Sequence, residues 1–156
     1  CKPRVRGFRF EGAPGAQLSG PLHQAIKERA IDCVIICPSN PFVSIAPILA
    51  VPGMRDLLTE DLPVVAISPI VGGKAIKGPA AKMMAELGLS PSALNIARYY
   101  RGIIDGMVID TADEADTETL RNLGLNVLST NTLMKTKGIR KSLARMVISF
   151  ARSLNG

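Results

Sequence analysis

A segment with paired glycines and two lysines, SPIVGGKAIKGP (68–79), is the first candidate for chemistry in this sequence. Gly72 and Gly73 allow positive φ angles, which let backbone amides turn toward a ligand. Lys74 and Lys77 place positive charge beside those amides. The segment lacks the spacing of a Walker A loop and shares only its physics, so it predicts a site for phosphate groups. A plain glycine turn with solvated lysines is the alternative.

A second polar segment, CPSNPFVSI (37–45), offers short side chains that suit a phosphate or a carboxylate. Ser39, Asn40 and Ser44 lie between an expected strand and an expected helix whose first amide groups would be free to bind an anion. We expect these three side chains to contact the same ligand. An ordinary strand-to-helix turn with Ser44 as the N-cap is the alternative.

Carboxylates gather in a third segment, where the sequence has Asp105, Asp110, Asp113, Glu114 and Asp116. Carboxylates at the end of a strand can bind Mg²⁺ directly or through water, and Asp110 is the candidate ligand. The alternative is that Asp110 or Asp113 caps the next helix while the other acids are solvated, because acids are common in the first turn of a helix.

Strand-like and helix-like segments alternate along the chain and must position these groups. Strand patterns occupy 5–10, 32–37, 62–68, 106–110 and 125–129; helix patterns occupy 21–30, 45–58 with a break at Pro52 and Gly53, 79–87, 91–100, 113–123 and 139–154. This order predicts an α/β fold with a mostly parallel sheet and flanking helices. Ligand loops in such sheets lie at the carboxyl ends of strands, so we expect 38–44, 69–78 and 111–116 to meet there. Residues 79–103 are a possible small helical cap.

The composition limits the classes of function. The 156 residues, 47% of them apolar, suit one domain with a core, and the net charge of +6 suits a polyphosphate ligand. Only 4% of residues are aromatic and no reader motif is present, so we expect no nucleic-acid partner. No apolar run approaches the length of a membrane span. Cys33, Cys37 and His23 form no metal-binding pattern, so we expect reduced thiols in a cytoplasmic protein.

Three longer blocks resemble consecutive parts of the 2-phospho-L-lactate transferase family: CPSNPFVSIAPILAVPGMRDLL, PVVAISPIVGGKAIKGPAAKMMAELG and DGMVID, with RVRGFRFEG fitting the region before them. The resemblance covers about 4–154. It implies a Rossmann-like fold about twice as long, of which 1–156 would be the C-terminal part of a single transferase domain. The family's GGTGG-type nucleotide loop has no counterpart in this sequence. We therefore expect the chain to be inactive and poorly stable on its own.

The resemblance also implies an activity. The family transfers a 2-phospholactyl or phosphoenolpyruvyl group from a guanosine diphosphate-linked donor to the deazaflavin FO, releasing GMP, in coenzyme F-420 biosynthesis. Mg²⁺ and a homodimer are expected. Lys74 and the amides of Gly72 and Gly73 would hold phosphate oxygens, and the 39–44 side chains would hold the other side of the phosphate or the lactyl carboxylate.

The alternative is a regulator of the gluconeogenesis-factor family, which has a similar polar segment after a strand and binds a sugar nucleotide. The GGKAIKGPAAKMM block favours the transferase. The sequence leaves open which donor is used and which group is the catalytic base.

Overall fold

Four parallel strands form the central sheet of this protein, whose computed structural model describes residues 3–59 and 62–154. In sheet order they are β1 (Val34–Ile36), β2 (Val64–Ile67), β5 (Gly106–Asp110) and β6 (Asn126–Thr130). In the register, Ile35 pairs with Val65, Val65 with Gly106, and Gly106 with Asn126. Every residue of β2 and β5 is buried, as expected for strands covered on both faces. The parallel α/β prediction is confirmed.

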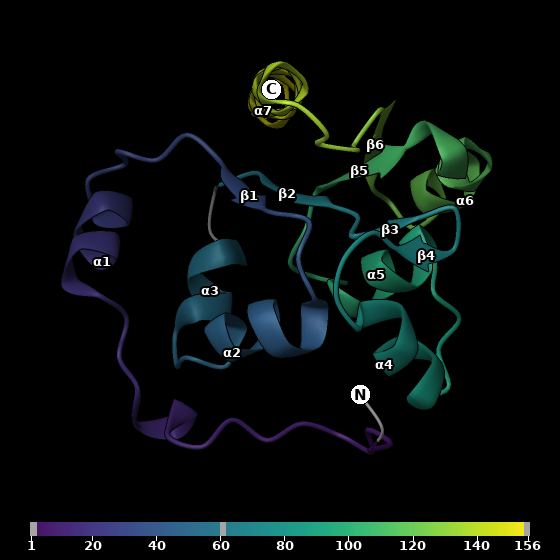
Figure 1. The fold of residues 1–156 in the computed structure, drawn as a ribbon. Coiled ribbons are helices and arrows are strands. Elements are labelled where there is room, and N and C mark those ends of the chain that lie inside the picture. The colour runs from purple at the N-terminus through teal and green to yellow at the C-terminus, as the bar shows by residue number, and fades with distance from the viewer. Residues whose placement is uncertain (1–2, 60–61, 155–156) are drawn as a thin grey trace.

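Two unequal layers of helices cover the sheet (Figure 1). In the described part of the chain, one face carries α7 (Lys137–Arg152), whose Leu143 and Val147 pack in one core with Val65 and Val108. The other face carries η2 (Pro41–Ile45), α2 (Ala46–Leu49), α3 (Met54–Thr59), α4 (Ala80–Glu86) and α5 (Ala93–Tyr99). This arrangement of helices on both faces of a parallel sheet is Rossmann-like.

The helices begin and end where local chemistry requires. The expected break in 45–58 is confirmed, because α2 ends before Pro52 and Gly53 and α3 starts after them. The pair expected as a cap, α4 and α5, packs into the main core through Met84 and Ile96, together with Tyr100 directly after α5. Whether these helices also close over a ligand stays a prediction.

At the margins, η1 (Ala13–Gly15) and α1 (Gly20–Lys27) have no buried residue. The expected helix at 113–123 is instead a short 3-10 helix, η3 (Thr111–Asp116), followed by α6 (Thr117–Arg121). None of the helices within the described residues has both the length and the apolar character needed to cross a membrane.

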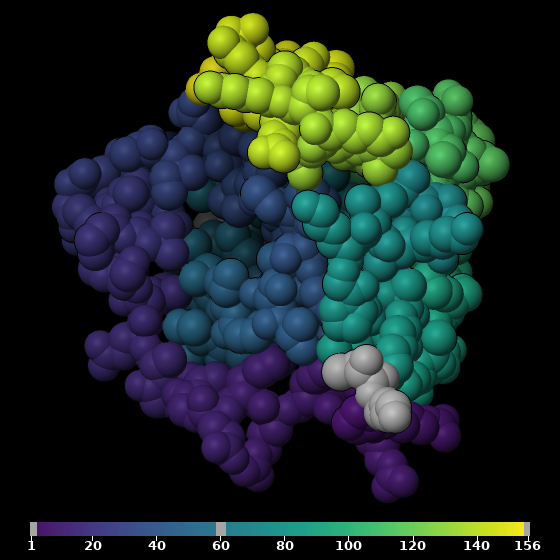
Figure 2. All heavy atoms as spheres, in the orientation of Figure 1, coloured from purple at the N-terminus to yellow at the C-terminus, as the bar shows by residue number. Residues whose placement is uncertain are grey.

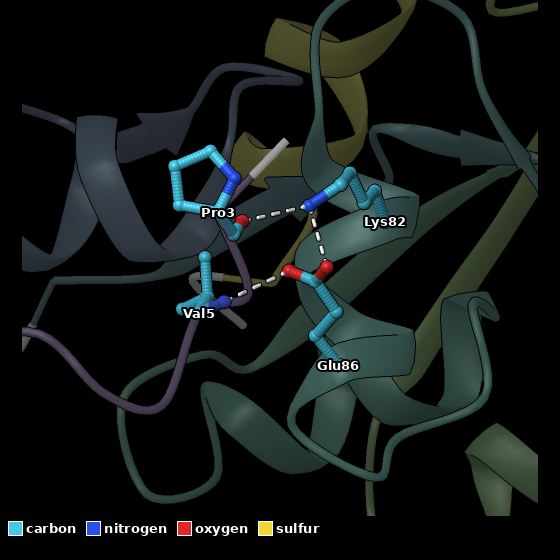
Figure 3. Close-up of polar contacts among 4 residues, drawn as sticks. All are labelled: Pro3, Val5, Lys82 and Glu86. Atoms are coloured by element: carbon cyan, nitrogen blue, oxygen red, sulfur yellow. Dashed lines mark hydrogen bonds and ion pairs between the residues drawn. The ribbon is translucent and has the colours of Figure 1, made fainter. Parts of the chain in front are cut away.

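The strand predicted at 5–10 is wrong, because these residues join no sheet. The segment is held by side chains of α4 instead (Figure 3): the Val5 amide donates to the Glu86 carboxylate at 3.0 Å, and Lys82 donates to the Pro3 carbonyl at 3.2 Å. Phe8 also stacks on Phe42, with ring centroids 5.4 Å apart. Alternation of apolar and basic residues indicates that one side of a segment is buried. It does not show that another strand lies beside the segment to pair with it.

Candidate functional site

The paired glycines form the turn of a small hairpin, β3 (Ile70–Val71) with β4 (Lys74–Ala75), which the sequence analysis did not predict. Gly72 and Gly73 have φ angles of 56° and 73°, and a two-residue hairpin loop with positive φ at both positions is the turn that matches the twist of its strands. The glycines are therefore needed for a tight turn. Whether this turn also binds phosphate stays a prediction.

The base of the hairpin is fixed by a buried hydroxyl. The Ser68 side chain accepts a hydrogen bond from the Ile70 amide at 3.1 Å and donates one to the Ile70 carbonyl at 2.9 Å. Both residues are almost fully buried, so the hydroxyl satisfies backbone groups that water does not reach. Ser68 thus ties the hairpin to the carboxyl end of β2.

The tip of the hairpin contacts a carboxylate from a distant segment. The Gly72 amide donates to both oxygens of Asp113 in η3, at 3.0 and 3.1 Å. One of the two amides predicted to bind phosphate is therefore already bonded to an anion. Lys74 and Lys77 are exposed, and neither makes an ion pair with any residue that the structure describes. Their ammonium groups are accessible to a ligand.

In the segment after β1, Asn40 is the N-cap of η2, so the alternative that placed Ser44 there is wrong. The Asn40 side-chain oxygen accepts from the amides of Phe42 at 2.9 Å and Val43 at 3.3 Å. The backbone carbonyl of Asn40 accepts a hydrogen bond from the Ser44 amide at 3.1 Å. These amides, expected to be free for an anion, are used within the turn. The half-buried Ser39 and the exposed Ser44 keep hydroxyls that bond no other described residue.

The two polar segments lie at the same edge of the sheet, as predicted. β1 and β2 are parallel neighbours, so the chain leaves both strands on the same side. The Asn40 amide nitrogen also contacts the Met83 sulfur at 3.3 Å, and Met83 belongs to the helix that follows the hairpin. Figure 2 shows the segment after β1, in blue, directly against the teal segment that follows β2. Ser39, Asn40 and Ser44 are thus brought to the side of the sheet that carries Gly72 and Lys74.

Asp110, the predicted metal ligand, is buried at the carboxyl end of β5 and caps η3. One oxygen accepts from the Ala112 amide at 3.0 Å, and the other accepts from the Thr132 amide at 2.8 Å and its hydroxyl at 3.0 Å. Burial by itself would raise the pKa of Asp110, but these hydrogen bonds outweigh burial and hold the pKa below its usual value. The carboxylate is therefore a structural link between β5, η3 and the loop after β6.

These bonds bear on whether Mg²⁺ fits. A direct bond from Asp110 to the ion would have to displace at least one of the donors that now contact its oxygens. Within residues 3–59 and 62–154, no three His, Cys, Asp or Glu side chains are grouped so that they could share a metal ion. In this arrangement the residues present do not fit a magnesium site centred on Asp110, and the metal stays a prediction from the family resemblance.

Asp113 is in the opposite electrostatic situation. Burial raises the pKa of this carboxyl; the Gly72 amide lowers it in part, and repulsion from Asp116 and Asp110 adds to the increase. No described cation pairs with it. Among the residues that the structure describes, the one hydrogen-bond donor to Asp113 is the Gly72 amide at the hairpin tip.

Three residues that build this edge were not among the predicted site residues: Ser68, Asp113 as a hairpin contact, and Thr132. Thr132 lies in a polar stretch just after β6, so the rule that found the other loops also applies to it. The partner of Asp113 is 41 residues away, and no local pattern signals that contact.

Comparison with known proteins shows which family this chain resembles. Residues 1–147 match the family model described as 2-phospho-L-lactate transferase CofD. Relatives from several methanogens carry the name 2-phospho-L-lactate transferase, and three of them show the degree of similarity. The one from Methanococcoides burtonii is 40% identical over 147 residues, 94% of this chain and 47% of the relative. The one from Methanosarcina barkeri is 39% identical with the same coverage. The one from Methanocaldococcus jannaschii is 44% identical over 131 residues, 84% of this chain and 40% of the relative. The chain spans about half the length of the curated relatives it matches.

Proposed function

The chain belongs to the 2-phospho-L-lactate transferase CofD family, and from that premise we propose that it forms part of an enzyme that transfers a 2-phospholactyl or phosphoenolpyruvyl group to the deazaflavin FO. The donor is a guanosine diphosphate-linked lactate or enolpyruvate, and GMP is released. The observation that carries the class of reaction is the match over residues 1–147. The two polar segments follow parallel neighbouring strands, and this supports the proposal that the donor binds at that edge of the sheet.

The proposed reaction is a displacement at phosphorus. A hydroxyl oxygen of FO forms a bond to the phosphorus that bears the lactyl or enolpyruvyl group. The bond from that phosphorus to the bridging oxygen breaks, the electron pair stays on GMP, and the hydroxyl proton passes to a base. Such a transfer depends on holding the two reactants in line and on stabilising the charge that develops on the leaving phosphate.

Lys74 is the residue in this chain best placed to stabilise that charge. Its ammonium is exposed next to the glycine turn and has no described ion-pair partner. The Gly73 amide, beside it in the turn, is the second proposed donor to phosphate, whereas the Gly72 amide is bonded to Asp113. Lys77, three residues further, adds positive charge to the same approach.

The segment after β1 is proposed to hold the other end of the donor. The hydroxyls of Ser39 and Ser44 are available there, while Asn40 contributes mainly by shaping the turn that presents them. Bound Mg²⁺ would supply further charge neutralisation at a diphosphate. A cytoplasmic homodimer completes the proposal.

The test is a transferase assay on the complete protein with FO and each donor, following GMP release. Lys74→Ala is expected to lower kcat/KM by well over tenfold, because a charged contact to the reacting phosphate is lost. The matched control is Lys141→Ala, which removes another exposed lysine, from α7 on one face of the sheet. Turnover of Lys74→Ala near that of the control would contradict the role of Lys74. Binding of UDP-sugars without any transfer would favour the gluconeogenesis-factor alternative.

A further inference from the structure

The β3–β4 hairpin is too small to keep its own shape. It has two residue pairs, Ile70 with Ala75 and Val71 with Lys74, and two-stranded hairpins are at best marginally stable in water. Its base is held by the buried Ile70 and the Ser68 hydroxyl. Only the Val71–Lys74 pair of the hairpin flanks the exposed turn where Gly72 and Gly73 reverse the chain, so a contact from elsewhere is expected to add to its order.

That contact is the carboxylate of Asp113. Both of its oxygens lie within hydrogen-bond distance of the Gly72 amide, at 3.0 and 3.1 Å. A hydrogen bond to an ionised acceptor is about twice as strong as one between neutral groups. The bond spans 41 residues of sequence and joins the segment after β2 to the segment after β5.

Asp113 is in turn held by the central sheet. It lies in η3, whose first turn is capped by Asp110 through the Ala112 amide. The other oxygen of Asp110 bonds Thr132 after β6. The end of β5, the loop after β6 and the hairpin tip are therefore connected by the hydrogen bonds of Asp110 and Asp113 and by the short backbone of η3 between these two residues. The position of the turn is thus connected to β5, whose residues are all buried.

Lys74 directly follows the turn, so the placement of its backbone depends on Gly72 and Gly73. We propose that Asp113 is a positioning residue for the transfer reaction: its carboxylate holds the glycine turn so that Lys74 faces the diphosphate of the donor. This inference rests on the phosphate role proposed for Lys74. Asp113 does not itself contact the donor, since its negative charge would repel phosphate oxygens.

The test compares Asp113→Ala and Asp113→Asn in the complete protein, labelled with ¹⁵N. Alanine removes the acceptor, whereas asparagine keeps one oxygen that can accept from Gly72. Two readouts are independent of turnover: the hydrogen-exchange rate of the Gly72 amide, and the affinity for inorganic pyrophosphate measured by calorimetry. Glu118→Gln is the matched control, because it removes an exposed carboxylate from α6, the helix that follows η3.

We expect Asp113→Ala to speed Gly72 exchange by about tenfold or more and to weaken pyrophosphate binding by a similar factor, as loss of a charged hydrogen bond implies. Asp113→Asn should recover part of both losses, and Glu118→Gln should match the wild type. An unchanged exchange rate in Asp113→Ala would overturn the inference.

Two further outcomes would also overturn it, and they distinguish its failure from that of the proposed function. If exchange rises in Asp113→Ala but pyrophosphate affinity stays within about twofold while Lys74→Ala weakens it by tenfold or more, the lysine site is real and Asp113 does not position it. If Lys74→Ala also leaves the affinity unchanged, the phosphate role on which the inference depends has failed.

Discussion

At the scale of single residues, two carboxylates three positions apart show how burial and hydrogen bonding compete. Asp110 is buried, yet donors on both oxygens keep its pKa below the usual value. Burial raises the pKa of Asp113, because the hydrogen bond from the Gly72 amide offsets burial only in part and repulsion from acidic neighbours adds to it. The aspartate side chain is thus favoured in its charged form at position 110 and disfavoured in its charged form at position 113.

Asp110→Asn should destabilise the protein by about 2 kcal/mol, because the amide group keeps only one acceptor oxygen and turns an NH₂ toward either Ala112 or Thr132. Denaturant unfolding at neutral pH measures this loss. A variant within 0.5 kcal/mol of the wild type, roughly the range of a neutral surface substitution, would show that the capping bonds contribute little.

The pH dependence should separate the two residues. The lowered pKa of Asp110 gives stability that is complete above the ordinary aspartate pKa and is lost as the pH falls through the lowered value. The raised pKa of Asp113 has the opposite sign: its contribution is complete below the ordinary pKa and is lost as the pH rises through the raised value.

Asp113→Asn should therefore leave stability at neutral pH unchanged or slightly higher, in contrast to Asp110→Asn. Thermal unfolding across a pH series from acidic to neutral measures both variants. A large loss of stability at neutral pH in Asp113→Asn would contradict the sign inferred for this residue.

At the scale of elements, α7 and the sheet approach each other closely at a residue without a side chain. A Cβ atom at Gly106 would lie 3.0 Å from side-chain atoms of Leu154 and Phe150 and 3.1 Å from Val65. These distances are shorter than ordinary van der Waals contact. The close seating of the C-terminal end of α7 on β5 therefore depends on this glycine.

Gly106→Ala should cost about 1–2 kcal/mol, since Leu154 and Phe150 would have to move to make room. The control is Gly15→Ala, where an added Cβ meets no atom within 4 Å. Chemical denaturation of both variants tests this difference. Equal stability of the two variants would show that α7 adjusts without cost.

At the scale of the whole molecule, the N-terminal segment is tied to helix α4 across most of the described chain. The contact between Val5 and Glu86 spans 81 residues, and Lys82 joins both the Glu86 carboxylate and the Pro3 carbonyl. Two hydrogen bonds lower the pKa of Glu86, and the bond from Lys82 has a larger effect than the bond from the Val5 amide. The Phe8 ring adds an aromatic contact to Phe42.

Glu86→Gln should loosen this segment without unfolding the core. Trypsin cleavage after Arg4, Arg6 and Arg9 is expected to accelerate on the order of threefold, because local opening becomes easier. Mass spectrometry of a short digest measures the rates. The control is Glu118→Gln, whose partner Arg121 lies on the same helix. Equal cleavage in both variants would mean that the Glu86 carboxylate contributes little to holding the segment, beside the contacts of Pro3 and Phe8.

Much of the architecture could be predicted from local sequence patterns. The strand patterns at 62–68 and 106–110 correspond to β2 and β5, and the helix pattern at 139–154 corresponds to α7, which covers one face of the sheet. The parallel order then required the segments after β1 and β2 to meet at one edge. These features could be predicted because the pattern of buried residues and the order of the elements are both visible in local stretches of sequence.

The contacts that shape the candidate site were decided only by the tertiary structure. Whether Gly72 and Gly73 form a hairpin tip held by Asp113, and whether residues 5–10 pair with a strand or with α4, depends on partners 41 and 81 residues away. Amides and carboxylates bond whichever suitable group lies nearest in space. Sequence spacing alone does not determine that neighbour, because the packing of the whole chain does.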